Sequence, residues 1–188
     1  MIHRNSRPRL LGTSHPSVKM LFVLLILTVF GVEGVIAAPL SQHDFAITSV
    51  VDGKTIALKD PISKVISDLG SPPRATIEIK QPPDEGPWDV FRYEYPGLTV
   101  GFMRGWPTIE FLKLESRLFK TARGIRVGDT YAEVVRQYGP PISRSSERAV
   151  YQLKVASSKN GEPADWFSLD FELRSDKVTA IWVNIAGE

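Results

Sequence analysis

Two stretches of this chain, Ile56 to Pro72 and Ile125 to Pro141, carry the same pattern of apolar and polar positions. Each runs from an apolar segment to an aspartate, then to apolar residues spaced along one helical face, and ends in glycine and proline. The offset is constant, because 127 − 58 and 139 − 70 both equal 69. The pattern therefore predicts a structural unit that the chain uses twice.

The start of each unit carries residues that favour the beginning of a helix. Asp60 and Asp129 have short side chains that can accept a hydrogen bond from free helix amides. Pro61 follows at a first helical position, where a missing amide costs nothing. In the second unit Thr130 and Glu133 have capping-box spacing, so either Asp129 or Thr130 is expected to be the cap.

One short helix is predicted in each unit. Gly70 and Gly139 stand where a left-handed residue ends a helix, and prolines lie just beyond them. A helix of this length is not stable alone in water, so its apolar stripe must pack against other elements. The two stripes are Ile62, Val65, Ile66 and Leu69, and Tyr131, Val134, Val135 and Tyr138.

Most of the remaining chain alternates apolar and polar residues with the period of two that is typical of half-buried strands. A hairpin is predicted around Asp52-Gly53, within the β-rich run Phe45 to Leu58. The other predicted strands are Arg74 to Lys80, Val90 to Tyr95, Leu98 to Phe102, Ile109 to Leu114, Val150 to Leu153, Phe167 to Phe171 and Val178 to Val183. Trp182 is expected in the core together with Val178 and Ala180.

We therefore predict an α+β fold of two tandem repeats, each a short helical segment followed by an antiparallel β-meander. The first repeat is expected to span residues 39–116 and the second residues 117–188. About 65 residues per copy make a marginal core, so the repeats are expected to form one continuous structure.

The first 38 residues predict a secretory signal peptide. Glu33 interrupts its apolar run after about a dozen residues, short of the about 20 that a spanning helix needs. An uncleaved membrane anchor remains an alternative. We expect an extracytoplasmic protein, secreted, periplasmic or at the cell surface, that touches a membrane only through this segment if it is uncleaved. The features that carry the prediction are Arg4, Arg7, Arg9 and Lys19, the apolar run Met20 to Val32, and the small residues Ala37 and Ala38.

Charge and cysteine content narrow the function. Residues 1–38 hold four of the 23 basic and one of the 21 acidic side chains, so residues 39–188 have a net charge of 19 − 20 = −1. Without a basic surplus, nucleic-acid binding has no electrostatic support. The chain has no cysteine, which excludes disulfides, thiolate chemistry and the acylated cysteine of bacterial lipoproteins.

Candidate catalytic groups are scarce beyond the predicted signal peptide. His43 is the single histidine there, which leaves almost no ligands for zinc and no partner for a nucleophilic serine. Glycine-rich phosphate loops are absent. Asp170 and Glu172 share one strand face, which allows carboxylate-dependent hydrolysis or, alternatively, a solvated face of charge pairs. We predict no catalytic residue, no metal site and no cofactor.

The second unit, from Gly124 to Val183, combines a helical segment that opens with Gly-Asp-Thr and ends with Tyr-Gly-Pro-Pro with a run of predicted antiparallel strands. This resembles the small outer-membrane assembly lipoprotein family (SmpA/OmlA, BamE) and the tandem-repeat β-lactamase inhibitor protein. The resemblance implies helices packed on one sheet face and an open face or rim that docks another protein. The chain departs from both relatives in having no cysteine.

From these observations we expect an exported, non-catalytic interaction module that docks a protein or cell-envelope component through an open sheet face. One alternative is a secreted enzyme inhibitor acting through the loop Pro82 to Pro87 or Ser157 to Asp165. Another is a carboxylate-dependent hydrolase of wall polymers. The predicted partner-binding residues are Trp88, Arg92, Glu94, Trp106 and Asp170, of which the tryptophans lie in turn-like stretches beside Pro87 and Pro107.

Overall fold

The computed structural model describes residues 37–80, 88–155 and 165–186. By its contacts the chain divides into two compact units, Met1–Gly34 and Val35–Glu188, and every described residue belongs to the second unit. The signal peptide predicted for residues 1–38 therefore lies almost entirely outside the described residues. Among those residues, no helix combines the length and apolar character needed to cross a membrane.

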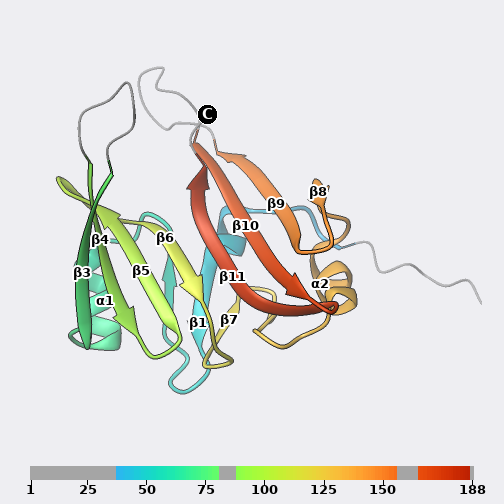
Figure 1. The fold of residues 1–188 in the computed structure, drawn as a ribbon, viewed down its shortest axis with the longest axis horizontal. Helices are drawn as coiled ribbons and strands as arrows, with labels where there is room; N and C mark the ends of the chain where they lie inside the picture. Colours follow the sequence, from blue (N-terminus) through green and yellow to red (C-terminus); the bar gives the residue numbers. More distant parts are fainter. Residues whose placement is uncertain (1–36, 81–87, 156–164, 187–188) are drawn as a thin grey trace, which may run out of the picture. The chain divides into compact units, whose positions relative to one another are not determined.

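The prediction of two repeats, each with a helix and a meander of its own, is wrong. The described chain is predominantly β, with two α-helices and two antiparallel sheets in a mixed, α+β-like fold. Eight strands form one sheet in the order β3-β4-β5-β6-β11-β10-β9-β8 (Figure 1). They are β3 (Arg74–Lys80), β4 (Trp88–Tyr95), β5 (Leu98–Met103), β6 (Trp106–Leu114), β8 (Ser143–Arg144), β9 (Arg148–Val155), β10 (Asp165–Arg174) and β11 (Lys177–Ala186).

The middle of the large sheet is the pairing of β6 with β11. Leu112 lies opposite Val183 and Leu114 opposite Ile181, so strands from the two halves of the chain share one ladder of hydrogen bonds. Two separate meanders would leave the edges of β6 and β11 without partners for their backbone amides and carbonyls. Pairing the two edges removes that cost, which is why one sheet forms in place of two.

A second, three-stranded sheet has the order β2-β1-β7. A 3-10 turn, Gln42–Phe45, leads into β1 (Ala46–Ser49), which forms a hairpin with β2 (Thr55–Ala57) around Asp52-Gly53. The third strand, β7 (Phe119–Thr121), comes from a segment in which we predicted no strand, and it pairs with β1. The sequence pattern missed it because a three-residue strand is too short for alternation to be visible.

The helices α1 (Ile62–Leu69) and α2 (Tyr131–Tyr138) lie where they are predicted, and each is followed by a glycine with φ of 83° or 76°. Thr130 is the cap of α2, since its hydroxyl accepts from the Glu133 amide and the Glu133 carboxylate accepts from the Thr130 amide. The two aspartates do not cap these helices. Their carboxylates accept hydrogen bonds from the amides three residues earlier, Ala57 for Asp60 and Arg126 for Asp129.

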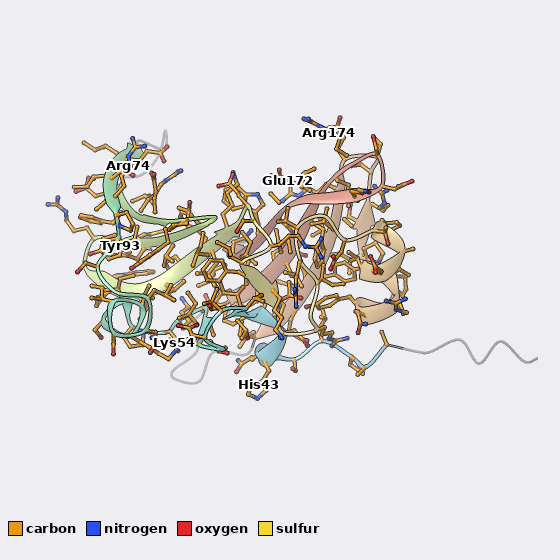
Figure 2. The ribbon with its side chains drawn as sticks, turned by 90° about the horizontal axis from the view of Figure 1, so that it is seen from below. His43, Lys54, Arg74, Tyr93, Glu172 and Arg174 are labelled. Atoms are coloured by element: carbon orange, nitrogen blue, oxygen red, sulfur yellow. The ribbon has the colours of Figure 1, made fainter. Side chains whose placement is uncertain are left out.

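Both helices and the small sheet pack on the same face of the large sheet. The Tyr95 hydroxyl donates to the Gly70 carbonyl at the end of α1, and the Phe45 ring meets the Phe167 ring edge-on at 5.4 Å. Tyr138 at the end of α2 packs against Phe171, with ring centroids 5.6 Å apart. Among the described residues no element covers the opposite face, which we call the open face. Figure 2 shows Glu172 on this side and His43 and Lys54 on the other.

Candidate functional site

The strand register decides which side chains lie on the open face. One row runs across the sheet through Arg92, Gly101, Phe111, Asn184 and Ser168. The neighbouring row contains Glu94, Thr99, Lys113, Trp182 and Asp170. The two rows lie two residues apart along each strand, so all of these side chains lie on one side of the sheet. They come from both halves of the chain, and only the β6–β11 pairing brings them together.

Three of the five predicted partner-binding residues, Arg92, Glu94 and Asp170, therefore share this face. Trp88 is the first residue of β4, but its side chain lies outside the described part of the structure. Trp106 is the first residue of β6, next to the turn that joins β5 to β6, and 62% of it is exposed. Trp106 lies outside the two rows that define the centre of the open face.

Three of the described aromatic rings on the open face lie beneath a cation. The Arg92 guanidinium is 5.6 Å from the centroid of the Phe111 ring, and the Lys113 ammonium is 4.9 Å from that of Trp182. On the neighbouring strands the Lys154 ammonium lies 5.2 Å from the Trp166 ring. A cation and the face of an aromatic ring attract each other electrostatically, and this holds both partners in place.

Gly101 is what allows Phe111 to lie flat on the sheet. A Cβ at this position would stand 1.8 Å from the ring carbon Cε1 of Phe111, which is far inside van der Waals contact. The ring therefore occupies the space above the glycine and approaches Trp182, with the two centroids 6.0 Å apart. The alternation of apolar and polar residues in the sequence does not show that the Phe111 ring covers the strand beside it.

The expectation that Trp182 lies in the core is wrong. β11 carries one extra residue, Thr179, between Val178, which faces Leu173, and Ala180, which faces Glu172. Such a bulge reverses the side on which every later residue lies. Val178 therefore packs in the core, whereas Trp182 is half-buried on the open face and its indole nitrogen donates to Glu172 at 2.7 Å.

Asp170 is buried although it lies on the open face. Only 1% of the residue is exposed, because the long side chains around it close over it. Its carboxylate accepts hydrogen bonds from the Arg148 guanidinium and, at 2.6 Å, from the Ser168 hydroxyl. A buried carboxylate is tolerated when it is paired and hydrogen-bonded in this way. We did not predict Arg148 or Ser168 as its partners, and only the strand register identifies them.

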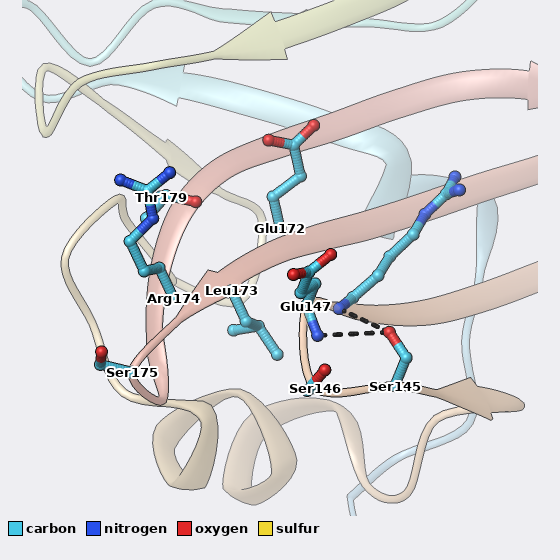
Figure 3. Close-up of a pocket in the computed structure, with 9 residues that line it drawn as sticks. Ser145, Ser146, Glu147, Glu172, Leu173, Arg174, Ser175 and Thr179 are labelled. Atoms are coloured by element: carbon cyan, nitrogen blue, oxygen red, sulfur yellow. Dashed lines mark hydrogen bonds between the residues drawn. The ribbon is translucent and has the colours of Figure 1, made fainter.

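Two hollows adjoin Arg148 and Glu172, and Asp170 lines the smaller of them. The smaller has a volume of about 290 Å³ and is lined by Arg148, Asp170, Glu172, Trp182 and Asn184. The larger, of about 700 Å³, lies between the turn before β9 and the β10–β11 hairpin (Figure 3). Arg148 and Glu172 line both hollows, so the two are parts of one depression. Its larger part is lined by Ser145, Ser146, Glu147, Arg148, Glu172, Leu173, Arg174, Ser175 and Thr179.

The tight turn Ser175-Asp176 sets one wall of the larger hollow. Both residues have positive φ, 50° and 57°, as a two-residue turn of type I′ requires. The turn brings Arg174 opposite Lys177 and ends the sheet there. On the other wall the Ser145 hydroxyl accepts from the amides of Glu147 and Arg148, which holds that turn closed. The hollow presents hydroxyls and charges of both signs.

A further charge cluster joins β6 to β10. The Lys59 ammonium lies 3.5 Å from carboxylate oxygens of both Glu110 and Asp165. Glu110 is 8% exposed. Burial raises the pKa of its carboxyl group, and the Lys59 ammonium and the Thr108 hydroxyl oppose the rise. Lys59 occupies the left-handed region at φ 66°, and the corresponding residue 69 positions later is Gly128, at φ 90°.

The two loops that we considered for an inhibitory role, Pro82 to Pro87 and Ser157 to Asp165, lie outside the described residues except for Asp165. Groups of three or more histidine, cysteine, aspartate or glutamate side chains placed to hold a metal ion were not found in the described ranges.

A scan against protein-family models found no match, and a search of curated proteins found none either. Among solved structures the chain is similar to the uncharacterized protein YfeY from Escherichia coli. The sequence identity is 11%, the match covers 69% of this chain and 92% of that one, and the TM-score is 0.38. A likeness this remote supports no argument about fold or function. The resemblance to the outer-membrane assembly lipoproteins and to the β-lactamase inhibitor protein therefore stays a prediction.

Proposed function

We propose that this chain is an exported, non-catalytic interaction module of the bacterial cell envelope or medium that docks a protein partner through the open face. The observation that carries the proposal is the set of half-buried rings on an uncovered sheet face, each beneath a cation: Phe111 with Arg92, Trp182 with Lys113, and Trp166 with Lys154. Tryptophan and arginine are enriched among the residues that contribute most to protein interfaces.

The adjoining depression supports a protein partner over an apolar ligand. It combines hydroxyls with Arg148, Arg174, Glu147 and Glu172, so both signs of charge are available for complementary contacts. Mixed charge of this kind favours specificity of docking and the rate of encounter. Apolar small molecules instead prefer concave sites with mainly hydrophobic walls.

The contacts of Asp170 and Glu172 give no support to the alternative of a hydrolase. Asp170 is held by Arg148 and Ser168, and Glu172 accepts from the Trp182 indole. A hydrolase of the two-carboxylate type needs two carboxyl groups that are free to act on the sugar ring, on its leaving group or on water. Both carboxylates are instead engaged with neighbouring side chains of the open face, so docking remains the better proposal.

Site-specific photo-crosslinking in the producing cell tests the proposal. p-Benzoylphenylalanine is introduced either at Lys113, on the open face, or at Lys54, on the opposite side of the molecule. We expect a protein adduct from position 113 and none of the same mass from position 54. Adducts at position 113 that resist protease but are shortened by glycosidases would instead identify a wall polymer and contradict docking to a protein.

A matched pair of variants makes the test specific. Arg92→Ala combined with Trp182→Ala should abolish capture of the crosslinked partner, since it removes a cation and a ring from the open face. His43→Ala combined with Lys54→Ala, on the opposite side, should leave capture unchanged. Circular dichroism establishes that each variant is folded. Equal capture by both double variants would rule out the open face as the docking surface.

A further inference from the structure

The large sheet ends in an unprotected edge at β3. This strand is seven residues long, and in the described part of the chain its outer side has no pairing partner. Ile77 and Ile79 are 57% and 64% exposed on it. The opposite edge differs, because β8 contains only Ser143 and Arg144. Long edges with exposed apolar residues are templates for pairing with a further strand, and proteins usually shorten or shield them.

The sequence of β3 is complementary to itself. When two copies run antiparallel with Thr76 opposite Thr76, Arg74 of each copy faces Glu78 of the other, and Ala75 faces Ile77. Residues directly opposite each other lie on the same side of the paired strands and contact each other. The charged pairs would therefore form on one side of the strand pair and the apolar pairs on the other. Centring the pair on Ile77 gives neither charge an opposite partner, and centring it on Glu78 places two carboxylates face to face. The register centred on Thr76 is therefore favoured.

The charged side chains are placed to reach a second copy. The Arg74 side chain is 71% exposed and its nearest carboxylate, that of Glu94, is 3.5 Å away. Glu78, whose side chain is 47% exposed, accepts from Arg92 and keeps solvent access. Both are on the side of β3 that continues the open face, whereas Ile77 and Ala75 lie on the other side. A second copy would cover apolar surface on one side and pair charges on the other.

We propose that β3 pairs with β3 of a second copy of this chain, antiparallel and centred on Thr76, and joins two eight-stranded sheets into one. A dimer built on a single strand pair buries little surface, so the association is weak, with a dissociation constant on the order of 100 μM. The proposal is independent of the partner that docks on the open face. The dimer would extend the open face across the two-fold axis, because the open faces of both copies lie on the same side of the joined sheet.

Charge reversal tests the pairing and its register together. Arg74→Glu places a second carboxylate opposite Glu78 of an identical copy at both contacts, and Glu78→Arg places two pairs of guanidinium groups together. Each variant alone should raise the dissociation constant about tenfold or more, measured by sedimentation equilibrium. In an equimolar mixture the heterodimer has opposite charges at both contacts, because the Arg74→Glu copy presents two carboxylates to the two guanidinium groups of the Glu78→Arg copy. Native mass spectrometry of the mixture should therefore show the heterodimer in excess over either homodimer.

The control is Arg136→Glu, which makes the same charge change as Arg74→Glu on α2, away from β3. It should dimerise like the unaltered chain. A chain that stays monomeric up to about 500 μM would overturn the proposal. So would single variants that dimerise as well as the unaltered chain, or a mixture in which heterodimers are no more abundant than random assortment gives. Thermal unfolding of each variant separates lost pairing from lost folding.

Discussion

Asp44 and Arg123, 79 residues apart in the chain, form a two-pronged ion pair. Nε of Arg123 donates to one carboxylate oxygen of Asp44 at 2.6 Å and Nη2 donates to the other at 2.9 Å. The same guanidinium also donates to the backbone carbonyls of Ala38, Pro39 and Gln137. One side chain thus ties the first described residues to the turn before β1 and to the end of α2, which makes it the best single site for testing the fold.

Arg123→Ala should lower the free energy of unfolding by roughly 2–4 kcal/mol, because it leaves the largely buried Asp44 carboxylate without its partner. Urea denaturation measures the loss. Arg136→Ala is the control, since Arg136 forms an exposed pair with Glu133 at 3.9 Å, and pairs of that kind contribute little. An equal shift of the urea midpoint in both variants would mean that the Arg123 contacts contribute no more than a surface pair.

The Asp44–Arg123 pair should also make the free energy of unfolding fall in acid. Burial alone would raise the pKa of Asp44, but hydrogen bonds from Arg123 and Ser41 and the guanidinium charge hold it below the ordinary 3.8. A carboxyl whose pKa is lower in the folded state contributes stability above its unfolded pKa of about 3.9, and this is lost as the pH falls through the folded value. Urea midpoints between about pH 7 and pH 2 should therefore decline less steeply in Asp44→Asn than in the unaltered chain. Parallel acid profiles would contradict the assignment to Asp44.

Two neighbouring tyrosines should respond in opposite ways to loss of the hydroxyl. The Tyr138 hydroxyl is buried and has no hydrogen-bond partner among the described residues, whereas that of Tyr151 donates to the Gly139 carbonyl at 2.9 Å. Tyr138→Phe should leave the stability unchanged or raise it, and Tyr151→Phe should lower it by about 1 kcal/mol. Thermal unfolding of both variants checks the contrast, and equal losses would contradict it.

Tyr138 should also limit stability in alkali. Burial raises the pKa of Tyr138 to about 12. A phenol with a higher pKa in the folded state contributes stability that is complete below its unfolded pKa of about 10 and is lost as the pH rises through the folded value. Urea midpoints of Tyr138→Phe should therefore fall less between about pH 9 and pH 12 than those of the unaltered chain. An unchanged alkaline profile would exclude Tyr138 as a source of the loss.

Gly101→Ala should destabilise the chain by roughly 1–3 kcal/mol, because the added methyl group displaces the Phe111 ring from its place over the strand. In a chain that already carries Phe111→Ala, the same change should cost much less. A double-mutant cycle on urea unfolding measures this coupling. Additive effects would show that the ring and the glycine do not share the space that the structure assigns to them.

Local features near the helices were predictable because they depend on residues close together in the chain. The capping box of Thr130 and Glu133 and the positive φ of Gly70 and Gly139 follow from turn and cap chemistry. The roles of Asp60 and Asp129 were not predictable in the same way. Both aspartates are compatible with capping, and the structure uses them to close the preceding turn.

Of the candidate site, the sequence indicated a shared polar side for Arg92, Glu94 and Asp170, but not the order of the strands that carry them. Alternation tells which residues share a face of one strand, and it contains no information about which strand lies beside it. Phe111 and Trp182 meet because β6 pairs with β11. That pairing joins residues about 70 positions apart, and no short-range pattern specifies it.

The sequence by itself determined the two helices, their ends and most strand positions, because caps, glycine turns and period-two alternation act over a few residues. The tertiary structure decided that eight strands form one sheet, that β7 joins β1, and that Trp182 lies on the open face. The single sheet forms because the backbone amides and carbonyls at the edges of β6 and β11 need hydrogen-bond partners. The single extra residue Thr179 reversed the strand faces after Val178, and a change of that size is invisible in the hydrophobic pattern.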